Sequence, residues 1–136
     1  MITAIILAFS MFALLQFFIS YSRSVIAACS TQPLSPQVRE VAAIHGRSVS
    51  GEEFVRLVQL ARLCPESKAD RWPVSSVNAY FRMLTFVRSV ANRMLPSLRE
   101  WTERERSGCA YFAAITLDRR IAYSRSLMAQ QLYNQH

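Results

Sequence analysis

The first 22 residues, MITAIILAFSMFALLQFFISYS (residues 1–22), carry no charged side chain, and most of residues 2–19 are large and apolar. Roughly 20 apolar residues, at a rise of 1.5 Å per residue, span the roughly 30 Å hydrocarbon core of a bilayer. The stretch therefore predicts a single membrane-spanning helix. We assign residues 1–29 to a transmembrane anchor and place the protein in the plasma (inner) membrane.

Two other interpretations of the N-terminus stay open. A cleaved secretory signal normally has a basic region before its apolar core, and here no basic side chain precedes the core. The order Ile26-Ala27-Ala28-Cys29 resembles a bacterial lipobox, in which the cysteine is acylated. Against that interpretation, Arg23 stands between the apolar core and Cys29, in a region that is normally uncharged.

The charges around the span predict its orientation. No lysine or arginine precedes it, whereas Arg23, Arg39 and Arg47 follow it. Because loops rich in basic residues stay in the cytoplasm, the C-terminal domain is expected there and the short N-terminus outside. Tyr21 and Arg23 are expected at the membrane interface, where an aromatic ring and a long basic side chain reach the headgroups.

The rest of the chain is basic. The net charge is +7, and among the 16 basic residues Lys68 is the single lysine. Next to a membrane span, this excess predicts contact with anionic lipid headgroups. A nucleic-acid partner is not expected, because the sequence has neither a clustered basic patch nor a known nucleic-acid-binding motif.

After a short linker (residues 30–35), residues 36–136 carry only helical patterns. Ser35-Pro36 starts a helix that runs to about His45, and the capping box Ser50–Glu53 opens another that runs to about Leu63. A broad apolar arc predicts a central helix from Pro73 to about Leu95. A last helix begins at Pro96, with Gly108 as its kink or end. The fold class is all-α: an N-terminal transmembrane helix followed by a small bundle of about four helices.

No catalytic pattern stands out. The three cysteines Cys29, Cys64 and Cys109 lie far apart, without the paired spacing of a metal or redox site. The two histidines belong to no motif, and the three glycines form neither a phosphate loop nor a nucleophile elbow. We therefore predict no metal, no cofactor and no enzymatic activity.

Arg88 falls on the apolar side of the predicted central helix. A buried guanidinium without a counter-charge is costly, so an acidic partner is expected. Asp118 is the single acid after Glu105 and is the predicted partner in a structural ion pair.

The last helix shows two faces. One is a seam with alternating spacings of four and three, which predicts packing against another helix; it comprises Ala110, Ala114, Leu117, Ile121, Ser124 and Met128. The other carries aromatic and arginine side chains of the kind enriched at protein interfaces, and it is the predicted partner interface: Tyr111, Ile115, Arg119 and Tyr133.

These features favour a single-pass membrane protein that acts as an accessory, structural or assembly subunit of a membrane protein complex. Its expected partners are an integral membrane protein complex or another helical protein. One alternative is a membrane-tethered ligand-binding module or enzyme with a pocket between helices, near Arg88 and Asp118. The other is a periplasm-facing lipoprotein acylated at Cys29.

Overall fold

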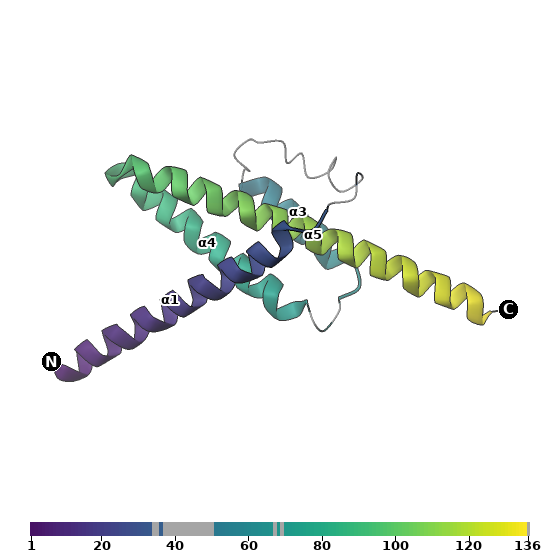
Figure 1. The fold of residues 1–136 in the computed structure, drawn as a ribbon, viewed down its shortest axis with the longest axis horizontal. Coiled ribbons are helices and arrows are strands. Elements are labelled where there is room, and N and C mark those ends of the chain that lie inside the picture. The colour runs from purple at the N-terminus through teal and green to yellow at the C-terminus, as the bar shows by residue number, and fades with distance from the viewer. Residues whose placement is uncertain (34–35, 37–50, 67, 69, 136) are drawn as a thin grey trace.

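The computed structural model describes residues 1–33, 36, 51–66, 68 and 70–135. Over these residues the chain forms helices and no strand, so the predicted all-α class is confirmed. The helices in order are α1 (Ile2–Ser30), α3 (Gly51–Leu63), α4 (Arg71–Met94) and α5 (Pro96–Asn134) (Figure 1). Apart from residue 36, the predicted helix over residues 36–45 lies outside the described residues, and so do Ser50 and the side chains of residues 51–53, which would form the predicted capping box.

The turn between α4 and α5 follows from one proline. Leu95 is extended, with φ −149° and ψ 112°, because the ring of Pro96 excludes the helical conformation from the residue before it. Pro96 then occupies the first turn of α5, where its missing N–H leaves no hydrogen bond unmade. α4 and α5 therefore form an antiparallel hairpin.

α1 has an uncovered half and a packed half. Up to residue 17 every side chain is exposed, and α1 as a whole is long and apolar enough to cross a membrane. From Phe18 onward α1 packs on the bundle, and the helix ends at Ser30. Figure 1 shows the uncovered half of α1 projecting from the bundle.

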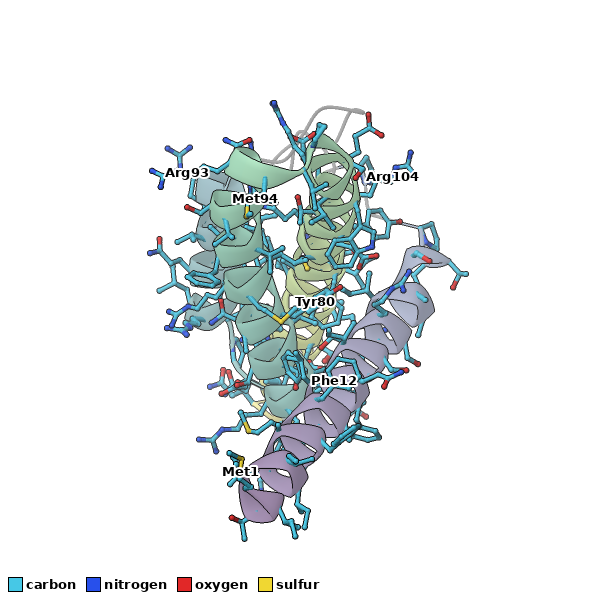
Figure 2. All side chains as sticks on the ribbon, turned by 90° about the vertical axis from the view of Figure 1, so that its left-hand side faces the viewer. Met1, Phe12, Tyr80, Arg93, Met94 and Arg104 are labelled. Atoms are coloured by element: carbon cyan, nitrogen blue, oxygen red, sulfur yellow. The ribbon has the colours of Figure 1, made fainter. Side chains whose placement is uncertain are left out.

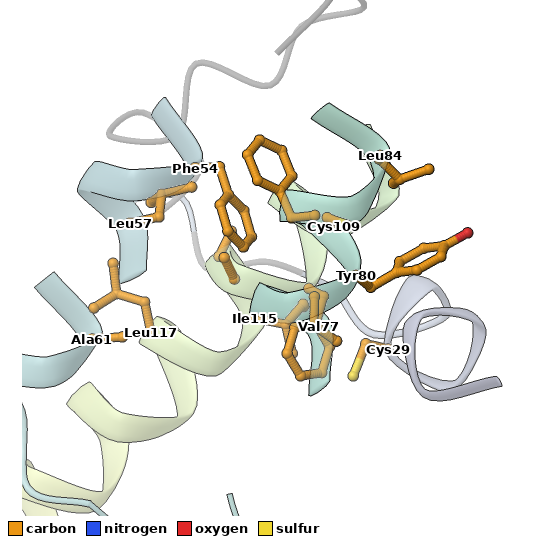
Figure 3. Close-up of a cluster of buried hydrophobic side chains, with 14 residues drawn as sticks. Cys29, Phe54, Leu57, Ala61, Val77, Tyr80, Leu84, Cys109, Ile115 and Leu117 are labelled. Carbon is orange, nitrogen blue, oxygen red and sulfur yellow. The ribbon is translucent and has the colours of Figure 1, made fainter. Parts of the chain in front are cut away.

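α5 is the central helix, which corrects the prediction that the helix ending at Leu95 is central. α1, α3 and α4 all pack on α5, and its middle stretch, residues 109–117, is buried at every position except the half-buried Tyr111. The broad apolar arc of α4 does not mean burial on all sides, because Phe86 and Val90 are exposed. The core between α3, α4 and α5 is lined by residues such as Phe54, Leu84 and Leu117 (Figure 3).

α5 also continues past the bundle. It runs for 39 residues without interruption, so the prediction of a kink or end at Gly108 is wrong. The predicted seam is buried from Ala110 to Leu117, whereas Met128, further along it, is exposed. The last part of α5, residues 122–134, projects from the bundle, and we call it the C-terminal arm (Figure 1).

Candidate functional site

The junction between α1 and the bundle brings together several of the predicted site residues. Its apolar layer begins where the ring of Phe18 meets the ring of Tyr80 edge-on, with the centroids 6.4 Å apart. Further along α1, Ser22 and Cys29 are buried. Close approach is possible because α5 has Gly108 opposite Ile26: a Cβ at position 108 would lie 3.1 Å from Ile26 Cγ2.

A polar network connects the three helices of the junction. Arg23 Nε of α1 lies 3.3 Å from Glu105 Oε1 of α5, and the Tyr80 hydroxyl of α4 donates a hydrogen bond of 2.9 Å to Glu105 Oε2. Burial, together with this hydrogen bond to a carboxylate, raises the pKa of Tyr80 well above its usual range. Tyr80 therefore acts as a neutral donor. Arg23 and Tyr21, both predicted at the membrane interface, are exposed to 58% and 40%.

Three of the four predicted partner-interface residues serve contacts within the chain. The Tyr111 hydroxyl donates to the backbone oxygen of Gln32 at 2.6 Å, and Arg119 Nη2 donates to Gln32 Oε1 at 2.9 Å. Ile115 is 2% exposed and belongs to the core. The helical pattern correctly grouped these residues on one face, but it could not reveal that the chain's own N-terminal segment reaches that face. Tyr133, 85% exposed on the C-terminal arm, stays available to a partner.

In the hairpin of α4 and α5, Arg88 pairs with Glu103 and not with the predicted partner Asp118. Arg88 Nη2 lies 3.6 Å from Glu103 Oε1, and about a third of each side chain is exposed. Asp118 lies 15 residues further along α5, which corresponds to about 22 Å at 1.5 Å per residue. Because the pair of Arg88 with Glu103 is partly solvated, it is expected to contribute about 1 kcal/mol or less.

Two other arginines, Arg106 and Arg120, are buried, and they are the buried cations among the residues that the structure describes. Arg120 is 3% exposed; its Nη1 donates to the backbone oxygen of Ala61 in the last turn of α3, and its Nη2 lies 3.3 Å from Glu66 Oε1. A cation at the C-terminal end of a helix also interacts favourably with the helix dipole. Arg120 thus ties α3 to α5.

Arg106 is held differently. It is 5% exposed, and its guanidinium carbon lies 5.0 Å from the centroid of the Phe81 ring, a cation–π contact. The ring of Phe81 in turn stacks on Phe54 of α3 at 3.9 Å. Burial, and then the positive charge of Arg88, lower the pKa of Arg106. In the part of the chain that the structure describes, the Nε atoms of Arg106 and Arg120 meet no hydrogen-bond acceptor.

The sequence held a signal for these two arginines. Arg106 and Arg120 are 14 residues apart, about four helical turns, and share a side of α5 with Cys109 and Ala113. Both of those small residues are buried. The mixture of acidic and basic residues at positions 99–106 is typical of a solvated helix face, which obscures the signal at Arg106.

Three features of the described residues bear on reaction chemistry: the metal-ligating side chains, the cysteines and the space between the helices. No three metal-ligating side chains lie together there, and the cysteines are free thiols. Burial raises the pKa of the Cys109 thiol to about 12, so it does not form a reactive thiolate at neutral pH. The space enclosed between α3, α4 and α5 is about 10 Å³, room for no more than a water molecule.

An open groove runs between α3 and α4, with a volume of about 520 Å³. Its lining is mixed: Val55, Val58 and Phe81 are apolar, and Arg62 and Arg82 are charged. Neither Arg88 nor Asp118 is among the residues that line it, so the predicted pocket around those two residues is not the one observed.

Comparison with known proteins identifies no relative of this chain. No family model matches this chain, and neither a curated protein nor a solved structure shows significant similarity to it.

Proposed function

We propose that this protein is an accessory or assembly subunit of a membrane protein complex. It is anchored by α1, and it presents the C-terminal arm of α5 to another subunit. The observation that carries the proposal is that helices leave the bundle at two places. The uncovered half of α1 is apolar on all sides, and the arm exposes Met128, Leu132 and Tyr133 to solvent.

The junction supports an anchoring role. An anchor that only tethers a domain needs no contact with it, but here α1 supplies Cys29 to the core and Arg23 to an ion pair. α1 and the bundle therefore form one stiff unit, with the bundle next to the bilayer that α1 enters. Such stiffness suits a subunit that positions a partner.

The arm supports the choice of a protein partner. Met128 and Leu132 are four residues apart and share one side of the helix, and large exposed apolar side chains on a helix are typical of a surface that another helix covers. The partner is expected on the same side of the membrane as the bundle.

Purification in mild detergent tests this function. The full chain should copurify with a partner at fixed stoichiometry, and Met128→Glu/Leu132→Glu should release that partner without changing the melting temperature of the bundle. The matched control is Gln130→Glu/Gln131→Glu, which adds the same charge to the same arm. A complex that survives the first pair of substitutions would place the binding surface elsewhere.

The alternative of a lipoprotein is less well supported. Cys29 is buried in the packed half of α1, and acylation there would follow cleavage that removes most of α1 from the bundle. The alternative of a ligand-binding module would need an open hollow such as the groove between α3 and α4, since the small space between α3, α4 and α5 holds no more than a water molecule.

A further inference from the structure

The side of α4 that faces away from the core is apolar and uncovered. Phe86, Val90 and Met94 follow one another at four-residue spacing and therefore lie along one side of the helix, on which Phe86 is directly opposite the buried Val77. Phe86 is 70% exposed and Met94 is 77% exposed. We call this surface the outer face of α4. The exposed Trp72 extends it toward the start of α4, and the exposed Leu95 extends it into the turn.

Arginines border the outer face, and the stretch of chain that carries it contains no acid. From residue 71 to residue 99 the chain has five arginines and no acidic residue. Arg82 and Arg93 are exposed beside Phe86 and Val90, and Figure 2 shows Arg93 next to Met94 at the same end of α4. An apolar helix face with aromatic residues and flanking arginines is typical of a helix that lies in the interface of an anionic bilayer.

The outer face also lies close to the anchor. The contact of Phe18 with Tyr80 places α4 beside the point where the uncovered half of α1 begins. α4 packs on α5 through its buried side, and Figure 1 shows α4 on the same side of α5 as the uncovered half of α1. A bilayer that holds α1 is thus within reach of the outer face.

We infer that the outer face of α4 rests on the surface of the bilayer that α1 enters, with its apolar side chains among the lipids and Arg82 and Arg93 on anionic headgroups. This inference rests on the proposed function, because it requires α1 in the membrane. A second copy of the chain fits this face less well. A symmetric contact would bring the arginines of both copies together, and no acid from residues 71–99 would offset them.

Quenching of a single tryptophan by brominated lipid tests the inference on the full chain. In a Trp72→Phe/Trp101→Phe background, Phe86→Trp reports on the outer face, and Tyr123→Trp on the arm is the matched aromatic control. The vesicles contain phosphatidylcholine and phosphatidylglycerol with brominated acyl chains. The tryptophan at position 86 should be strongly quenched by the lipid and weakly by aqueous iodide, and the one at position 123 should show the opposite.

A third probe separates this inference from the anchorage of α1. Phe12→Trp, in the same background, should be quenched by the lipid whenever α1 is in the bilayer. Quenching at position 12 without quenching at position 86 would overturn the inference alone, and no quenching at either position would overturn the anchorage as well. A tryptophan at position 86 that is shielded from both iodide and lipid would show that protein covers the face, which also overturns the inference.

Neutralising the two arginines tests the contact of the outer face with anionic headgroups. Arg82→Gln/Arg93→Gln should lower the lipid quenching at position 86 by about half or more in vesicles that contain phosphatidylglycerol, because each arginine near an anionic surface contributes to binding. The matched control is Arg56→Gln/Arg62→Gln on α3, which removes the same charge elsewhere and should leave the quenching unchanged. Equal effects of the two pairs would contradict a specific contact of the outer face with anionic lipid.

Discussion

Gly108 allows α1 and α5 to pack closely; it does not form a turn. Gly108 lies inside α5, where glycine costs about 1 kcal/mol relative to alanine in helix propensity. The structure accepts this cost because a Cβ would meet Ile26 at 3.1 Å. An alanine would recover propensity and lose packing, so its net effect is expected to be small.

A larger side chain at the same position gives a clear prediction. Gly108→Leu should lower the free energy of unfolding by about 2 kcal/mol, because overpacking forces α1 away from α5. Adding Ile26→Ala should restore part of this loss, and a double-mutant cycle from thermal unfolding in detergent measures the coupling. Strictly additive effects of the two substitutions would show that residues 26 and 108 do not touch.

Arg120 is the residue whose loss should affect the bundle most directly. Arg120→Met keeps much of the side-chain volume but leaves the Ala61 carbonyl without its donor, so the free energy of unfolding should fall by about 2 kcal/mol. Arg104→Met, at an exposed position on the same helix, should change it by about half a kcal/mol at most. Urea unfolding of both variants makes the comparison; similar losses would mean that Arg120 is solvated.

At the scale of the elements, the contact of α1, α4 and α5 should be sensitive to alkaline pH. The raised pKa of Tyr80 means that the folded protein keeps the phenol proton above pH 10, while the unfolded chain releases it. The unfolded state then binds fewer protons, so the free energy of unfolding falls by about 1.4 kcal/mol per pH unit above pH 10. Cys109, with its pKa raised to about 12, adds a similar decline from pH 9 up to pH 12.

Tyr80→Phe isolates the contribution of Tyr80. At pH 7 it should cost about 1 kcal/mol, because the hydrogen bond to Glu105 is lost. Above pH 10 the decline with pH should become shallower by about 1.4 kcal/mol per pH unit, since the phenol no longer titrates. Urea unfolding at several pH values measures both effects, and equal slopes for the two proteins would show that Tyr80 is not buried with its proton.

At the scale of the whole molecule, the membrane orientation is the property on which the proposed function depends. Arg23, Arg39 and Arg47 follow the uncharged start of the chain, so a reporter that is active only in the cytoplasm should be active when fused after residue 136. Neutralising these three arginines and adding arginines before Ile2 would place the positive charge on the other side of the span, and this should lower the activity of the cytoplasmic reporter. Activity of a periplasm-only reporter in the unaltered chain would reverse the orientation and revive the lipoprotein alternative.

The sequence by itself determined the helical class, the long apolar N-terminal helix, and the break at Leu95-Pro96. These features depend on local rules: the length of an apolar run, a periodicity of 3.6 residues, and the conformational restriction that proline imposes. Which segments of the chain pack against each helix face was decided by the tertiary structure alone. A helical wheel shows that Tyr111, Ile115 and Arg119 share a side, but not that Gln32 and the core meet them.

The same reason explains the central helix and the buried cations. α4 has the more apolar pattern, yet α5 is the helix surrounded by the others, because burial depends on how many neighbours pack against a helix and not on its own composition. Arg88 shares its side of α4 with buried residues but stays partly solvated, whereas Arg106 and Arg120 are buried where α3 and α4 close over α5. Local periodicity decides which side chains lie together, and only the packing of distant segments decides what covers them.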